Sequence, residues 1–284
     1  LWDVVLQVPD SLAKAEALIS IGKLRAVEYA ERISLYLRDL NFSPTQDADD
    51  GEKRAYGAII ALEKLRDIRG FSPVFFASEA WYSRRVRLQA ERSLLDIVDD
   101  PTDAISEIVR LETPERKLRA LTAEMSSKAT AARKIGVAIQ ALDLGHQRIA
   151  RDKNEGLAFA ELRKYALRSL IGYKAQGTAP VSGCKESYER GFDDEERLLG
   201  LAALGANGAD PAATALRDII LKLNADQKGG ITDETRNRMA RAAIDNAAIA
   251  KNRILRVALM SVTSNDKWSN SIIQAAQAAL KVTP

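Results

Sequence analysis

The chain has 284 residues, of which 46% are hydrophobic and 29% are charged. This balance is too apolar for a disordered polypeptide and is ordinary for a folded protein. The 42 basic and 39 acidic residues leave a formal charge of +3, which is too small for polyanion binding without local clustering, so nucleic acid is not an expected partner.

Apolar residues spaced three or four positions apart recur in paired stripes, which is the pattern of amphipathic helices. The first pair lies near the N-terminus, with a short turn expected at residues 23–25. Its two stripes are Ala13, Ala17, Ile21 and Leu24, followed by Ala26, Ala30, Ile33 and Leu37. The sequence therefore predicts two helices that pack against each other through these stripes.

Two further pairs follow in chain order. One has its first stripe at Ala55, Ile59, Leu62 and Leu65, breaks at Gly70 and restarts after Ser72-Pro73. The next has stripes at Val86, Ala90, Leu94 and Ile97, then at Ala104, Ile105, Ile108 and Leu111, with a helix start at Asp100-Pro101 between them.

The clearest pair covers residues 195–224. Its second helix is expected to be capped by Asp210, with Pro211 at the first helical position. Looser pairs are expected over 114–144, 156–191 and 233–265, and a last helix over 268–281. Residues 173–191 are expected to be the least regular, because Gly172, Gly177, Pro180 and Gly183 interrupt the helical pattern.

Three of these segments resemble HEAT repeats of the short kind named after phycobilisome lyases. They read AEALISIGKLRAVEYAERISLYLRDLN, VRLQAERSLLDIVDDPTDAISEIVRL and ERLLGLAALGANGADPAATALRDIILKL. The expected fold is therefore all-α: a single α-solenoid domain over residues 1–284, with about seven HEAT-like antiparallel helix pairs and a terminal capping helix. The resemblance implies scaffolding, with the second helices lining the inner face.

No familiar catalytic, metal or nucleotide motif is found in the sequence. His146 is the only histidine, which excludes metal sites with several imidazole ligands, and its place near a helix end favours a structural role. Cys184, next to Lys185, is interpreted as an exposed or partly packed thiol without a function. Paired acidic residues fall at predicted turns and helix starts. We therefore expect neither an enzyme nor a bound cofactor or metal.

Aromatic residues and arginines concentrate in residues 71–87, and the residues alone leave open whether this segment is core or interface. Arginines beside aromatic rings are typical of binding hot spots. The leading hypothesis is a non-catalytic scaffold or adaptor that binds an unidentified partner protein. The predicted partner-binding residues are Arg32, Tyr36, Trp81, Tyr82, Arg84, Arg85, Arg110 and Arg217.

Two alternatives stay open from the sequence. A nucleic-acid-binding protein or DNA glycosylase-like enzyme would need basic residues along the inner helices, and acidic neighbours dilute the available arginines. A bilin lyase-like protein is suggested by the repeat type alone. No segment has the roughly 18 to 20 apolar residues that cross a bilayer, so a soluble protein is expected. Its compartment stays open between the cytoplasm and, after removal of a leader, the periplasm or exterior.

Overall fold

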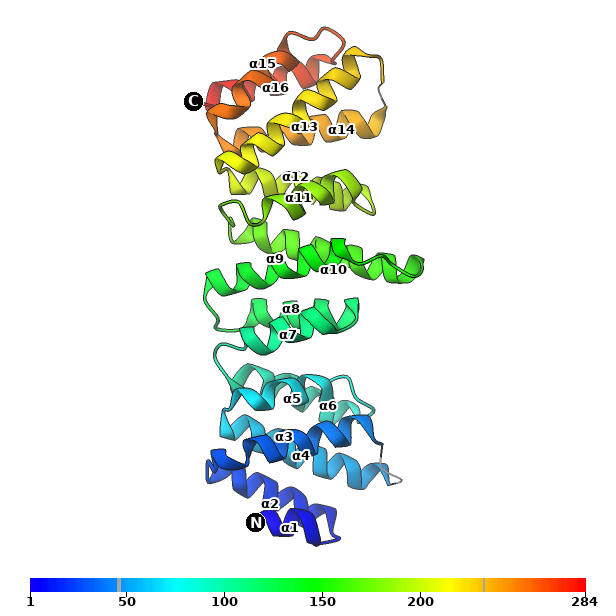
Figure 1. Ribbon diagram of the computed structural model, residues 1–284, viewed down its shortest axis with the longest axis vertical. Helices are drawn as coiled ribbons and strands as arrows, with labels where there is room; N and C mark the ends of the chain where they lie inside the picture. Colours follow the sequence, from blue (N-terminus) through cyan, green and yellow to red (C-terminus); the bar gives the residue numbers. More distant parts are fainter. Residues whose placement is uncertain (45–46, 232) are drawn as a thin grey trace. The chain divides into compact units, whose positions relative to one another are not determined.

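The computed structural model describes residues 1–44, 47–231 and 233–284, and helices hold 79% of the chain (Figure 1). No residue in these ranges lies in a strand, which confirms the predicted all-α class. The α-helices are α1 Trp2–Gln7, α2 Ser11–Lys23, α3 Ala30–Phe42, α4 Ala48–Leu65, α5 Phe71–Ala77, α6 Arg84–Ile97, α7 Thr102–Leu111, α8 Pro114–Ser126, α9 Ala131–Gln147, α10 Lys153–Gly172, α11 Val181–Arg190, α12 Asp194–Asn207, α13 Asp210–Lys228, α14 Glu234–Ala250, α15 Arg256–Thr263 and α16 Asn270–Val282. Three 3₁₀ turns are η1 Val27–Tyr29, η2 Ile68–Gly70 and η3 Arg253–Leu255.

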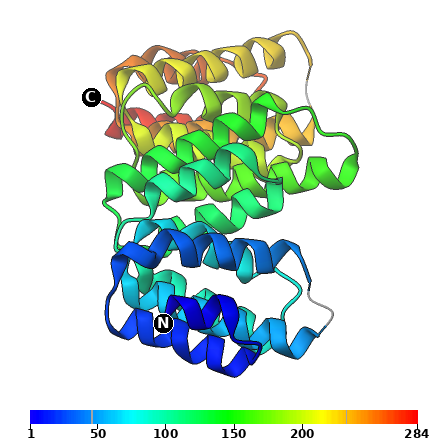
Figure 2. The ribbon, with the colours of Figure 1, turned by 60° about the horizontal axis from the view of Figure 1, so that its bottom comes forward.

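The helices form two compact units. Unit 1 comprises Leu1–Ile108 and Ser126–Thr130, and unit 2 comprises Val109–Met125 and Ala131–Pro284. In unit 1, α2 packs on α4 and α4 packs on α6, while α3 packs on α4 and on α5 (Figure 2). This alternation builds two layers of helices, with α2, α4 and α6 in one layer and α3 and α5 in the other.

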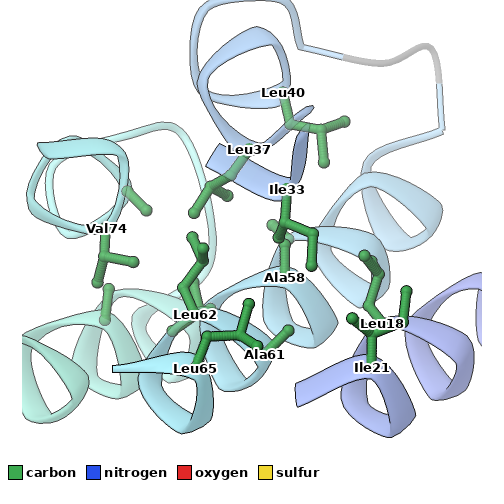
Figure 3. Close-up of a cluster of buried hydrophobic side chains, with 14 of the residues drawn as sticks. Leu18, Ile21, Ile33, Leu37, Leu40, Ala58, Ala61, Leu62, Leu65 and Val74 are labelled. Carbon is green, nitrogen blue, oxygen red and sulfur yellow. The ribbon is translucent and has the colours of Figure 1, made fainter. Parts of the chain in front are cut away.

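The core of unit 1 lies between these two layers. Side chains from α2, α3, α4 and α5 point toward one another there (Figure 3). The predicted stripes supply them, since Ile21, Ile33, Leu37 and Leu62 are all buried. Leu24 was expected in the same stripe but is 71% exposed, because α2 ends at Lys23 and the chain turns there.

Two glycines set the close approach of α2 to α4. A Cβ atom at Gly57 would lie 2.7 Å from the Cα of Ala15, and one at Gly22 would lie 2.7 Å from the Cα of Ala61. Real Cβ atoms do not approach backbone atoms this closely, so each helix presents a glycine to an alanine of the other. The pairing of α2 with α4 therefore depends on the absence of two side chains.

Unit 2 repeats the two-layer arrangement. Helices α10, α12, α14 and α16 pack successively in one layer. Helices α9, α11, α13 and α15 form the other layer, in which α11 packs on α9 and on α13, and α13 on α15. Fully buried side chains such as Leu167, Leu201, Leu216 and Leu259 fill the space between the layers.

A recurring turn connects the first layer to the second. Arg25, Arg66 and Lys251 each adopt a left-handed conformation, with φ of 53°, 54° and 49°, directly after α2, α4 and α14 or one residue later. One residue then precedes a 3₁₀ turn of three residues, which leads into the next helix. The same local conformation thus appears in both units, although glycine, the usual residue for a left-handed helix end, is absent from these three positions.

Residues 173–191 are more regular than expected, so this prediction is wrong for its second half. Helix α11 covers Val181–Arg190, and only residues 173–180 form a loop. Gly183 lies inside this helix, and its lack of a side chain lets α11 approach Leu142 of α9 closely. The predicted cap at Asp210 is also displaced by one position, since Ala209 is the cap residue and Asp210 is the first residue of α13.

None of the helices in the described part of the chain is both long enough and apolar enough to cross a bilayer.

Candidate functional site

The aromatic residues that precede α6 serve the fold. The Tyr82 hydroxyl donates a hydrogen bond to Asn41 Oδ1 at 3.0 Å, and the indole Nε1 of Trp81 donates to the Leu40 carbonyl at 3.0 Å. Tyr82 is 2% exposed, and burial raises the pKa of its hydroxyl. Both side chains fasten the segment before α6 onto α3. A partner could reach Tyr82 only if this segment unfolded, so Tyr82 does not belong to a binding surface of the folded protein.

The same segment ends in arginines that face solvent. Arg84, Arg85 and Arg87 are exposed and occupy the first turn of α6. Ser83, just before them, donates from its backbone N–H and from its hydroxyl to the Glu52 carboxylate, both at 2.6 Å. These bonds fix the start of α6 on α4. Residues 71–87 therefore belong partly to the core and partly to the surface. Phe71, Phe75 and Tyr82 lie in the core, and the arginines face solvent.

Three arginines in the first turn of a helix are electrostatically unfavourable. The helix dipole places partial positive charge at the N-terminus, and each added cation there costs about 0.3–1 kcal/mol. The first turn of α6 contains no acidic residue, and the Glu52 carboxylate bound to Ser83 is the acceptor next to this helix start. A sequence that departs from a local rule in this way commonly does so for function.

A shallow cavity of about 490 Å³ lies beside these arginines. It is lined by Tyr56 from α4 and by five residues of α6, and we call this set the α4–α6 surface: Tyr56, Arg84, Arg85, Leu88, Gln89 and Arg92. The guanidinium carbon of Arg85 lies 5.3 Å from the centroid of the Tyr56 ring, a cation–π contact. Among the residues that the structure describes, no carboxylate forms an ion pair with Arg84, Arg85 or Arg92. The three arginines of this surface therefore carry positive charge that no ion pair within the described ranges neutralises.

A second groove of about 350 Å³ adjoins this surface, and the two share Tyr56 and Arg85. We call it the α2–α4 groove. It is lined by apolar and acidic side chains, namely Leu12, Ala15, Glu16, Ile19, Asp49, Glu52, Lys53, Tyr56, Arg85 and Val86. A ligand that spans both sites meets guanidinium groups at one end and a mixture of apolar side chains and carboxylates at the other.

The remaining predicted residues lie elsewhere. Arg32 and Tyr36 are on α3, in the other layer of unit 1, where Arg32 lies 5.8 Å from the Tyr29 ring centroid. Tyr36 packs edge-on against Trp2, and burial raises its pKa while Arg54 opposes that shift. Arg110 and Arg217 belong to unit 2, and Arg217 is ion-paired with Asp218 at 2.7 Å. Of the eight predicted residues, the structure brings only Arg84 and Arg85 together in one solvent-facing cavity.

Sequence reasoning missed Tyr56, Leu88 and Arg92. A signal for two of them was present, because Arg84, Leu88 and Arg92 are spaced four residues apart and so share one face of a helix. The contribution of Tyr56 could not be found in this way, since it depends on which face α4 turns toward α6.

Histidine and cysteine form no accessible catalytic group in this structure. His146 Nε2 lies 2.8 Å from the Ser187 hydroxyl, but Ser187 is fully buried, so no substrate could reach that oxygen. Cys184 is also buried, contrary to expectation, and burial raises its pKa to about 12. In the ranges 1–44, 47–231 and 233–284, no three His, Cys, Asp or Glu side chains gather in a way that would hold a metal ion.

Comparison with protein-family models found no match for this chain, and comparison with curated proteins found no significant relative.

Proposed function

We propose that the chain is an α-solenoid of HEAT-like helical pairs that holds a partner protein, and that an acidic segment of this partner binds the α4–α6 surface. The alternating layers within each unit and the recurring turn after α2, α4 and α14 support the repeat architecture. The observation that carries the binding proposal is the unpaired arginines at the start of α6.

Carboxylates are the groups that this surface would hold most strongly. Arginine forms paired hydrogen bonds with carboxylates, and its charge is already present in the free protein. A carboxylate bound beside Arg84 and Arg85 would also interact favourably with the N-terminal end of α6. Binding would thus offset part of the electrostatic cost of the arginines at this helix start.

The α2–α4 groove favours a polypeptide over a nucleic acid. Glu16 and Glu52 line it next to Arg85, while Asp49 is paired with Lys53. The carboxylates of Glu16 and Glu52 would repel a phosphate backbone that continued past the arginines. Leu12, which is 58% exposed, and the half-buried Ile19 offer apolar contacts there. A protein segment that presents acidic side chains followed by apolar ones matches this order of groups.

The test measures, by fluorescence anisotropy, the binding of a synthetic peptide whose glutamates precede its leucines in the sequence. We expect Arg84→Glu combined with Arg85→Glu to weaken peptide binding about tenfold or more. The matched control, Arg32→Glu with Arg38→Glu on α3, should leave the Kd unchanged. The α6 variant should also be slightly more stable to heat, because acidic side chains suit the first turn of a helix.

Three results would overturn the proposal. The first is that the peptide does not bind, and the second is that the two double variants weaken peptide binding equally. The third is that a single-stranded oligonucleotide of the same charge displaces the peptide and binds more tightly. The last result would indicate nucleic-acid binding instead.

A further inference from the structure

A cavity of about 540 Å³ lies within unit 2. Its walls come from four successive helices, with Tyr188 on α11, Arg197 on α12, Lys222 on α13 and Arg236 on α14. Pockets of about 300–1,000 Å³ commonly hold small ligands. The size and the number of contributing helices make this cavity a candidate binding site separate from the α4–α6 surface.

Most of the charges in the cavity wall are already paired. Arg236 forms an ion pair with Asp233 and lies 3.8 Å from the carboxylate of Asp226. Arg190 pairs with Glu186 at 3.2 Å. These contacts occupy the carboxylates Asp226 and Asp233, so neither is free to neutralise the other cations of the cavity.

Arg197 and Lys222 are the exceptions. The Nε–H of Arg197 is buried and has no hydrogen-bond partner among the described residues. A buried donor without an acceptor destabilises the folded protein. Lys222 is exposed at the cavity wall and forms no ion pair within the described part of the chain. Two cations that line this cavity therefore form no ion pair among the described residues, and the third carboxylate of the wall, Glu189, lies 3.8 Å from Lys185.

Gly191 lies beside the side chain of Arg197. A Cβ atom at Gly191 would lie 2.9 Å from Arg197 Cγ, so the absence of a side chain at Gly191 makes room for the arginine stem. Tyr188 lines the same cavity, and its pKa is raised by burial, although the Arg197 guanidinium opposes that shift. The phenol is therefore protonated at neutral pH and is available as a hydrogen-bond donor.

We infer that this cavity binds a small anionic group with carboxylate or phosphate oxygens, held by the guanidinium of Arg197 and the ammonium of Lys222, with the Tyr188 hydroxyl as a further donor. All three groups donate hydrogen bonds, and charge-assisted bonds of this kind are the strong ones in proteins. An anion in the cavity would supply the counter-charge with which neither Arg197 nor Lys222 forms an ion pair among the described residues. The inference stands independently of the α4–α6 surface.

Isothermal titration calorimetry of the full chain at constant ionic strength tests this inference, with inorganic phosphate and succinate as separate probes. We expect saturable binding of at least one probe. Arg197→Gln and Lys222→Gln should each weaken it about tenfold or more, since each removes a charged donor. Arg241→Gln is the control, because Arg241 is exposed on α14, pairs with Asp245 at 3.0 Å and does not line the cavity.

The two probes distinguish the possible sources of the anion. Binding of phosphate alone would indicate a ligand with a phosphate group, and binding of succinate alone would indicate a ligand with carboxylate groups. Binding of both probes would indicate that the cavity accepts either kind of anionic oxygen. Lys222 is exposed, so Lys222→Gln should fold even if Arg197→Gln does not. Absence of saturable binding by either probe, or equal affinities in Lys222→Gln and Arg241→Gln, would overturn the inference.

Discussion

Arg163 and Glu196 form a buried ion pair that joins α10 to α12. Arg163 Nε and Nη2 donate to the two Glu196 carboxylate oxygens at 2.6 and 2.9 Å, and Nη1 donates to the Gly145 carbonyl at 2.8 Å. The Glu196 carboxylate also accepts the Phe192 backbone N–H at 2.9 Å. Every group of the pair is thus satisfied, which is the condition under which a buried ion pair is tolerated.

Removing one partner of this pair should be costly. We expect Glu196→Ala to lower the free energy of unfolding by about 3–5 kcal/mol, because Arg163 would keep a buried charge without its counter-ion. Urea denaturation measures the change. Asp245→Ala breaks the exposed pair with Arg241 and should cost no more than about 1 kcal/mol. Equal losses in the two variants would show that the Arg163–Glu196 pair is not the element that stabilises the contact of α10 with α12.

His146 should make the stability of the protein depend on pH. Burial lowers the pKa of its imidazole, and the nearby Arg163 guanidinium lowers it further. The unfolded chain therefore takes up the proton first, at its ordinary pKa of about 6.5. Stability should be complete above that pH and should fall as the pH drops from there through the lowered pKa of the folded state.

Chemical denaturation at a series of pH values between neutral and mildly acidic tests this expectation against His146→Gln. The variant should lose less stability over the same range. Both proteins retain Asp143, whose pKa is raised by burial and by Glu186 and whose pH dependence has the opposite sign, so its contribution cancels in the comparison. Parallel curves for the two proteins would contradict the role of His146.

At the scale of the element, small residues decide how closely helices approach. We expect Gly57→Ala to destabilise the protein by about 1–3 kcal/mol, since the added methyl group would overlap the backbone of Ala15 and force α2 away from α4. Gly136→Ala is the control, because no atom lies within 4 Å of a Cβ there. Gly136 is inside α9, so its substitution should stabilise by about 0.5–1 kcal/mol. Thermal melts compare the two, and a stabilising Gly57→Ala would show that the helices can separate freely.

The sequence predicts these elements well where an apolar stripe marks them. The stripes of α3 and α4 identified Ile33, Leu37, Ile59 and Leu62 as core residues, and all four are buried. Helix ends were harder to predict, because the left-handed residues after α2, α4 and α14 are basic residues where the usual rule expects glycine. The start of α11 was not predicted because Gly183 was interpreted as a helix breaker. In the structure Gly183 lies inside α11, where it allows a close approach to α9.

The candidate sites could be predicted only in part, and for a physical reason. Arg84 and Arg85 stand together in the sequence and share a helix face with Arg92, so their charge could be predicted to cluster. Tyr56 lies 28 positions before Arg84 and on another helix, and Arg197 and Lys222 also come from different helices. Their meeting depends on how α4 turns toward α6 and how α12 turns toward α13, and local periodicity does not specify this.

At the scale of the whole molecule, each unit has its own buried core. Leu62 is fully buried in unit 1 and Leu216 is fully buried in unit 2. Replacing either one with alanine leaves a cavity and should lower stability by about 2–5 kcal/mol. Proteins open in cooperative units that often follow their compact substructures. We therefore expect Leu62→Ala to speed hydrogen exchange of the amides in α2–α5 while the protection of α12–α14 is retained.

Leu216→Ala should give the opposite pattern, with faster exchange in α12–α14 and unchanged protection in α2–α5. Mass spectrometry of peptides from each unit resolves the two cases, and each variant serves as the control for the other. A loss of protection spread evenly over both units in both variants would contradict the expectation. It would mean that the chain unfolds as one cooperative body, which is the behaviour that a single domain over residues 1–284 predicts.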